Sequence, residues 1–173
     1  MRVLMIFDQI QAGMGGKEKA DLVLGGKKGA IGSVPMIDPH LKKVDGEVIA
    51  CLYCGDRYFK ENEEEVVSKM TAMVKKLNPD VVICGPAYNY KGYAYMCAVI
   101  AKSINEKTDI IAVAAMSKEN EDIILKYKDL VNIVKMPKKG GIGLNESLNN
   151  ICILAKKMFD KEDISELKEN ICY

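Results

Sequence analysis

The fold of this chain is decided by residues 60–104, which read KENEEEVVSKMTAMVKKLNPDVVICGPAYNYKGYAYMCAVIAKSI. Apolar residues recur at helical spacing through the first part: Val66, Val67, Met70, Met73, Val74 and Leu77. Residues 78–80 (Asn-Pro-Asp) stop that helix, and residues 81–84 (VVIC) predict a short buried strand. A second helix is predicted at 92–104. This alternation is typical of a parallel sheet covered by helices.

The same alternation extends outward along the chain in both directions. Strands are predicted at 2–7, 46–54, 108–115 and 130–134, and helices at 118–127, 144–159 and 162–170. Because such units wind right-handedly, we expect a three-layer α/β/α sandwich, Rossmann-like or flavodoxin-like, with a mainly parallel sheet of about five strands. We expect residues 1–173 to form a single α/β domain, with a long glycine-rich loop region at 8–45 and a polar terminal helix at 160–173.

Composition argues against several classes of protein. Lys and Arg number 25 against 24 Asp and Glu, so the chain has no basic excess for binding nucleic acid. No apolar run approaches the roughly 20 residues that span a bilayer, and residues 1–7 are too short for a signal peptide. Most of the six cysteines lie within apolar runs, which is typical of buried thiols in a reducing compartment. We therefore expect a cytoplasmic protein.

Ligands of open α/β sheets bind beyond the carboxyl ends of the strands. This rule selects five loops: 9–21, 55–62, 85–93, 116–120 and 137–145. In the first loop, AGMGGKEKAD (12–21), glycines would let backbone N–H groups approach an anion. The spacing is not that of a dinucleotide fingerprint, and Lys17 is not followed by Ser or Thr as in a P-loop. A flexible turn before a helix is an equal alternative.

The third loop is rich in tyrosine and surrounds one amide. Asn89 offers donors and acceptors, while Tyr88, Tyr90 and Tyr93 offer aromatic walls with polar tips. This composition favours a site for a small polar ligand over a purely structural turn. In the second loop, Asp56 could hold an amino group or a hydroxyl.

The Cys51-Leu-Tyr-Cys54 motif resembles a redox or zinc motif but falls on a predicted strand. Residues three apart on a strand point to opposite faces, so the two sulfurs could not share a metal or a disulfide. We therefore expect no metal site. Cys54 and Cys84 each end a strand beside a glycine, which makes them weak candidates for a catalytic thiol and better candidates for core thiols.

Four segments, taken in order, resemble one family. They are MRVLMIFDQIQAGMGGKEKAD (1–21), CGDRYFKEN (54–62), NPDVVICGPAYNYKGYAYMC (78–97) and MSKEN (116–120). Together they are similar to the amino-terminal region of the selenoprotein B subunit of glycine, sarcosine and betaine reductases, over residues 1–159. In that family a distal selenocysteine, near two further cysteines, is thought to attack the substrate's α-carbon while a pyruvoyl-bearing subunit holds the amine. That motif does not occur in residues 1–173, and Glu121 replaces a Pro that usually follows Glu-Asn.

The resemblance implies a truncated, stand-alone homologue that binds a small amine or amino acid as part of, or beside, a reductase complex. We expect no cofactor, and a homo-oligomer or hetero-complex with reductase subunits as partners. Asp56 and Glu119 would pair with an ammonium, Lys19 with a carboxylate, and Asn89 would orient the ligand. The full set of expected ligand-binding residues is Gly15, Gly16, Glu18, Lys19, Asp56, Asn89, Tyr93, Glu119 and Asn120.

Three other functions are compatible with the sequence. One is a thiol-dependent oxidoreductase that uses Cys54 or Cys84. Another is a non-enzymatic regulatory or assembly protein whose strand-end loops bind a partner chain. The third is a flavodoxin-like flavin or nucleotide binder, although the loop after the first strand lacks the Ser and Thr of a phosphate loop.

Overall fold

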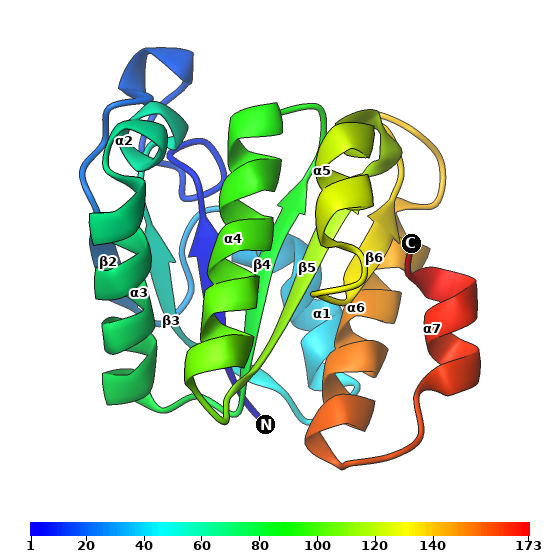
Figure 1. Cartoon of the computed structure of the whole chain (residues 1–173). Helices are drawn as coiled ribbons and strands as arrows, with labels where there is room; N and C mark the ends of the chain where they lie inside the picture. The colour runs from blue at the N-terminus through cyan, green and yellow to red at the C-terminus, as the bar shows by residue number, and fades with distance from the viewer.

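The computed structural model describes all 173 residues and contains one six-stranded sheet with the strand order β2-β3-β1-β4-β5-β6 (Figure 1). The strands are β1 (Arg2–Phe7), β2 (Gly25–Lys28), β3 (Glu47–Tyr53), β4 (Val81–Ala87), β5 (Ile111–Ser117) and β6 (Ile133–Met136). All neighbouring pairs are parallel except β2 with β3, which is antiparallel. The predicted α/β fold with a mainly parallel sheet is therefore confirmed, with one more strand than expected.

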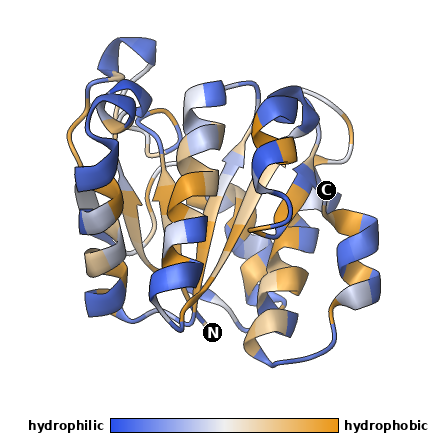
Figure 2. Ribbon diagram, in the orientation of Figure 1, coloured by the Kyte–Doolittle hydropathy of each residue, from blue (hydrophilic) through white to orange (hydrophobic).

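Helices cover both faces of the sheet and complete a three-layer sandwich (Figure 1). One face packs against α2 (Asp56–Glu61), α3 (Glu63–Leu77), α4 (Lys91–Lys107) and α5 (Glu121–Tyr127). The other face packs against α1 (Val34–Lys42), α6 (Leu144–Phe159) and α7 (Ser165–Ile171). Figure 2 shows the apolar strands enclosed between helices whose outer faces are polar.

Strand β1 is buried on both faces of the sheet. Its alternate side chains enter the two cores: Leu4 and Ile6 pack on the α3–α4 side, whereas Val3, Met5 and Phe7 pack on the α1–α6 side. A strand that is buried on both faces is a continuous apolar run, because neither face meets water. The run of apolar residues 3–7 therefore specifies the central position of β1 in the sheet.

The glycine-rich segment 8–45 contains more regular structure than a loop region. It includes the 3-10 turn η1 (Lys17–Lys19), the edge strand β2 and helix α1. Strand β2 reads GGKK and has no apolar alternation, so the sequence gives no strand signal there. Two other boundaries also differ from expectation. The predicted helix at 60–77 is interrupted at Asn62, and the polar terminal helix occupies only 165–171 of 160–173.

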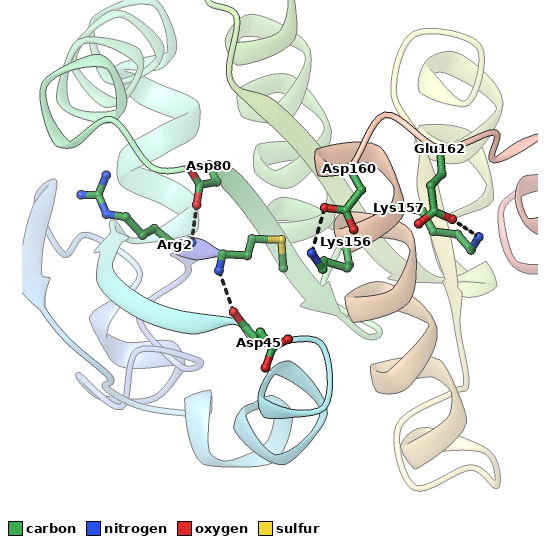
Figure 3. Close-up of polar contacts among 8 residues, drawn as sticks. Arg2, Asp45, Asp80, Lys156, Lys157, Asp160 and Glu162 are labelled. Carbon is green, nitrogen blue, oxygen red and sulfur yellow. Dashed lines mark hydrogen bonds and ion pairs between the residues drawn. The ribbon is translucent and has the colours of Figure 1, made fainter.

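Polar contacts secure the amino-terminal edge of the sheet, opposite the candidate site (Figure 3). The backbone N–H of Arg2 donates to the Asp80 carboxylate over 2.6 Å, and the amino terminus of Met1 donates to the Asp45 carbonyl oxygen over 2.6 Å. Two ion pairs, Lys156–Asp160 at 2.8 Å and Lys157–Glu162 at 2.6 Å, lie at the end of α6. None of the helices combines the length and the hydropathy needed to cross a membrane.

Candidate functional site

The site lies where the direction of winding changes in the sheet. From β1 the chain passes to β3 on one side, and from β3 it crosses to β4 on the other side of β1. The loops that follow β1 and β4 therefore leave adjacent parallel strands in opposite directions. Such a switch point opens a crevice at the carboxyl ends of the strands, which is the usual place for a ligand in this class of fold.

Two adjoining pockets occupy this crevice. The inner pocket, of about 260 Å³, is lined from the β1 loop by Asp8, Gly16 and Lys17, and from the β4 loop by Tyr88, Asn89 and Tyr90. Tyr93 of α4, Lys139 of the β6–α6 turn, and Ile10 and Gln11 of the β1 loop complete its wall. The outer pocket, of about 450 Å³, adds Gln9 and Asp56 and shares Lys17, Asn89 and Tyr90 with the inner one.

Asp8 is a buried carboxylate without a cationic partner. Only 2% of the residue is exposed, and its Oδ1 accepts one hydrogen bond, from the backbone N–H of Gln11 at 2.6 Å. No Lys, Arg or His forms an ion pair with it. Burial raises the pKa of Asp8 from 3.8 to about 6, and the nearby negative charge of Asp56 adds to the rise. The Asp8 carboxylate therefore has no ion-pair partner in the free site.

Asp56 is the first residue of α2 and lies beside the amino end of α4, where Gln9 holds it. The Gln9 Nε2 donates to Asp56 Oδ1 at 3.2 Å, and the backbone N–H of Asp56 donates back to Gln9 Oε1 at 3.3 Å. A Cβ added at Gly92 would lie 2.6 Å from Asp56 Oδ2, so glycine in the first turn of α4 is what admits the carboxylate. The partial positive charge at this helix end favours the negative side chain.

Three tyrosines shape the inner pocket. Tyr93 is buried and donates its hydroxyl to the Ile6 carbonyl oxygen at 2.9 Å, which fixes the ring against β1. The hydroxyls of Tyr88 and Tyr90 are buried and have no hydrogen-bond partner. Buried hydroxyls normally have partners, so these two are available to a ligand. The Lys17 ammonium lies 5.5 Å from the centroid of the Tyr90 ring, which shows that this aromatic face accepts a cation.

The structure brings together four of the residues predicted from the sequence. Gly16 and Tyr93 line the inner pocket, Asp56 lines the outer pocket, and Asn89 lines both. Gly15 lies beside them at φ +136°, a conformation that favours glycine. These residues come from three different loops, so the expected convergence at one edge of the sheet is present in the structure.

Glu18 and Lys19 lie outside both pockets. Glu18 is exposed and accepts a hydrogen bond from the Gly16 N–H at 2.8 Å, so it stabilises the turn rather than facing the crevice. Lys19 is exposed and packs beside Gly15, where an added Cβ would lie 2.3 Å from Lys19 Cγ. Lys17, two residues earlier, lines both pockets instead.

Asn120 and Glu119 also lie outside both pockets. Asn120 is buried, and its Nδ2 donates to the carbonyl oxygens of Tyr88 at 2.5 Å and Ser117 at 3.0 Å, so it fastens the β4 loop to the end of β5. Glu119 accepts a hydrogen bond from the Ser117 hydroxyl at 3.2 Å and lines a different groove, beside α5. Asn120 therefore positions the wall of the site, whereas Glu119 does not reach the inner or the outer pocket.

Comparison with known protein families identifies the family of the chain. The pattern of glycine/sarcosine/betaine reductase selenoprotein B (GRDB) matches residues 1–172. The chain belongs to this family.

Relatives of the chain are named as components of glycine and sarcosine reductase complexes. The chain is 33% identical over 163 residues to the glycine reductase complex component B subunit gamma of Carboxydothermus hydrogenoformans, covering 94% of this chain and 37% of the relative. It is 33% identical over 172 residues to the same component of Peptoclostridium litorale, covering 98% and 38%. The sarcosine reductase complex component B subunit beta of Peptoclostridium acidaminophilum is 32% identical over 130 residues, covering 75% and 30%.

The chain thus spans less than two fifths of the length of these reductase B relatives. No solved structure matches the chain. The family membership that the four sequence segments indicated is confirmed over nearly the whole chain.

The sequence did not identify the three charged residues that line the inner pocket, Asp8, Lys17 and Lys139. Asp8 could have been found, because it directly follows the five apolar residues 3–7, which are fully buried. A carboxylate in that position lies at the carboxyl end of a core strand. Lys17 was considered only as the lysine of a P-loop, which was excluded because no Ser or Thr follows it. Lys139 had no signal, because nothing in the KKGG sequence at 138–141 shows which lysine faces the crevice.

The cysteines of the reductase B homologue are buried and free. Cys51 belongs to the core on the α1–α6 side and Cys54 to the core on the α3–α4 side, which confirms that the two point to opposite faces. The Cys54 Sγ lies 3.4 Å from the Met96 Sδ. Burial raises the pKa of Cys54 to about 12 and raises that of Cys84 further.

A direct measurement follows for the proposed catalytic thiols. Because the neutral thiol is a poor nucleophile, we expect Cys54 and Cys84 to react with iodoacetamide at pH 7 far more slowly than glutathione. Peptide mass spectrometry after timed quenching would give both rates. Full reactivity in urea is the control for reagent quality. Modification of either thiol in the folded protein as fast as in urea would revive the thiol-dependent oxidoreductase.

Proposed function

We propose that the chain binds a small amine or amino acid in the inner pocket, as part of or beside a reductase complex. The observation that carries this proposal is Asp8, a carboxylate that is 2% exposed and has no cationic partner. A buried charge is costly unless it is paired, and an ammonium from a ligand would supply the missing charge. Burial of all six cysteines supports a cytoplasmic location.

The other groups around the pocket suit the opposite end of an amino acid. Lys17 and Lys139 bring positive charge for a carboxylate, and Asn89 brings both donors and acceptors. The free hydroxyls of Tyr88 and Tyr90 add two further partners. In this arrangement Asp8 takes the role expected for Glu119, and Lys17 the role expected for Lys19. The 260 Å³ volume is below the roughly 300 Å³ of pockets for drug-sized ligands, which fits a ligand of few heavy atoms.

The family supports the reductase part of the proposal. Relatives in the family are named as components of glycine, sarcosine and betaine reductase complexes. We propose that this chain contributes ligand binding, and that the selenocysteine chemistry implied by the resemblance resides on another polypeptide segment. The reductase subunits are then the expected partners.

Thermal unfolding with glycine, sarcosine, betaine and proline tests the ligand. At a hundred times its dissociation constant, a ligand that binds only the folded state adds about 2.7 kcal/mol to the free energy of unfolding. For a domain of this size, that corresponds to a rise in Tm of about 5–10 °C. We expect at least one of the four compounds to give this rise, and Asn89→Ala to reduce it.

The matched control is Asn145→Ala, because Asn145 is also an exposed asparagine at the carboxyl edge but lines neither pocket. This variant should retain the full rise in Tm. No rise with any of the four compounds would contradict the proposal and favour the regulatory or assembly function. Size-exclusion chromatography with purified reductase subunits would then show whether the chain binds a partner without a small ligand.

A further inference from the structure

Lys17 is the only charged residue that lines both the inner and the outer pocket. Its side chain is exposed and forms no ion pair. The ammonium lies 5.5 Å from the centroid of the Tyr90 ring, and Tyr90 also lines both pockets. Contact between a cation and an aromatic face is weak at an exposed site, because water competes for the cation. The Lys17 ammonium can therefore leave the ring at little cost.

The backbone that carries Lys17 is fixed in place. The N–H of Lys19 donates to the Gly16 carbonyl oxygen at 3.0 Å and closes the 3-10 turn η1. Just beyond this turn, the Asp21 carboxylate forms an ion pair with Arg57 of α2. Both contacts hold η1 beside the start of α2, at the carboxyl edge of the sheet (Figure 1). Only the side chain of Lys17 needs to move when a ligand enters.

The other charges of the crevice have both signs. Asp8 lines the inner pocket and Asp56 the outer one, and neither forms an ion pair. Lys139 is a second unpaired cation in the inner pocket. Lys91 lines the outer pocket and pairs with Asp122 at 3.2 Å. The sum of these charges selects neither a cation nor an anion, so selection depends on where the movable charge goes.

The resting position of Lys17 disfavours an amine that carries no anionic group. The ammonium of such a ligand would approach the same aromatic wall that the Lys17 ammonium already contacts. Two like charges at short range raise the free energy of the complex. A ligand with a carboxylate beside its ammonium instead offers Lys17 an anion, and a charge-assisted hydrogen bond is among the strong polar contacts.

We propose that Lys17 is a specificity-determining residue, which moves from the Tyr90 ring onto the carboxylate of an amino acid and excludes amines that lack a carboxylate. This inference rests on the proposed amine site and names the residue that selects among its ligands. Lys139 has a different role, because it lines only the inner pocket and contacts no aromatic ring. It attracts a carboxylate without being displaced from a resting contact.

Matched pairs of acid and amide test this role: glycine with glycinamide, sarcosine with sarcosinamide, and proline with prolinamide. Each amide keeps the ammonium and nearly the same size but has no negative charge. In calorimetric titrations of the full chain at about pH 7, where the amino groups are mostly protonated, the acid of at least one pair should bind about tenfold or more tightly than its amide.

Lys17→Met removes the charge and keeps the length of the side chain. In this variant the affinity for the acid should fall by about tenfold, because its charge-assisted contact is lost. The affinity for the amide should rise by about two- to fivefold, because a like charge near the surface is removed. Lys17→Arg keeps the charge and should keep the preference for the acid. Opposite changes for acid and amide distinguish selection by Lys17 from a general loss of structure.

The matched control is Lys19→Met, because Lys19 is an exposed lysine two residues later that lines neither pocket. It should keep the ratio of acid to amide affinity within about twofold. NMR follows the movement itself, since the ring current of Tyr90 displaces the resonances of the Lys17 methylene beside the ammonium. With assignment through Lys17→Met, the acid should remove this displacement and the amide should leave it.

Three outcomes would overturn the role of Lys17 and leave an amine site in place. One is equal affinity of the wild-type chain for acid and amide. Another is a preference for the acid that survives in Lys17→Met, which would assign the carboxylate to Lys139. The third is weaker binding of the amide in Lys17→Met, which would show that Lys17 assists amines. If neither acid nor amide binds the wild-type chain, the proposed amine site itself fails, and this inference fails with it.

Discussion

Replacing Asp8 by Asn is expected to stabilise the free protein at pH 7 while eliminating its binding of amines. The carboxylate is buried in the pocket wall, and burial raises its pKa from 3.8 to about 6. A carboxyl group whose pKa is higher in the folded state than in the unfolded state destabilises the fold once it ionises. Asn has nearly the same shape, still accepts the Gln11 hydrogen bond through its oxygen, and carries no charge.

The size and the pH range of the effect follow from the shift. Well below pH 3.8 the group is protonated in both states and contributes no difference. As the pH rises to about 6, the unfolded chain loses this proton first and the folded state becomes relatively less stable. Above that range the cost is complete, and a shift of about two units corresponds to about 3 kcal/mol. Asp8→Asn should recover up to this amount at pH 7.

Urea unfolding of both proteins between pH 3.5 and about 8 measures this difference. The two free energies of unfolding should nearly coincide at the acidic end and diverge as the pH rises through 6, with the variant more stable. Asp129→Asn is the matched control, because Asp129 is exposed, and its curve should follow that of the wild type. An Asp8→Asn variant that is less stable than wild type at pH 7 would contradict the expectation that the unpaired carboxylate destabilises the fold.

Gly55→Ala is expected to destabilise the fold by about 3 kcal/mol or more through a clash between backbones. A Cβ at Gly55 would lie 1.9 Å from the Ala20 carbonyl oxygen and 2.4 Å from the Ala20 carbonyl carbon. The backbone φ of Gly55 is −67°, an ordinary value, so the cost is steric and not conformational. The Gly55 N–H also donates to the Leu22 carbonyl oxygen at 2.7 Å, and the N–H of Tyr58 donates to the Ala20 carbonyl oxygen at 3.0 Å.

This contact between chain segments connects stability to function. Residues 20–22 follow η1 directly, so their docking on the start of α2 holds the turn that carries Lys17 over the crevice. Gly29→Ala is a useful comparison, because Gly29 has φ +74° and open space around it, and should lose only about 1 kcal/mol. Thermal and urea unfolding compare the two variants. A loss at Gly55 no greater than at Gly29 would contradict the proposed close contact.

The fold was predictable from the sequence because its central strands are continuous runs of apolar residues. The run VVIC at 81–84 and the apolar residues 3–7 are buried on both faces, so each reads as a strand without reference to the rest of the chain. Strand β2 was not predictable, because GGKK forms a strand only through pairing with β3. Tertiary pairing overrides weak local preference at such an edge.

The site was predictable in position but only partly in composition. The rule that ligands bind beyond the carboxyl ends of the strands selected the third loop, and its amide and tyrosines indicated Asn89 and Tyr93, both of which line the inner pocket. The choice between Lys17 and Lys19 depends on η1, in which Glu18 folds back onto the Gly16 N–H and determines which lysine faces the crevice. Glu119 was misplaced for a similar reason, since the Ser117 hydroxyl draws it to the far side of the β5 loop.

The titration of Asp8 itself is the most direct test of the uncompensated carboxylate. In the chain labelled with ¹³C at aspartate side chains, and assigned through Asp8→Asn, the carboxyl resonance should titrate with a pKa of about 6 in the free protein. Addition of the amine that raises the Tm most should lower this pKa, because a nearby cation favours the carboxylate. A pKa near 3.8 without ligand, or a pKa of about 6 that the amine leaves unchanged, would contradict this account.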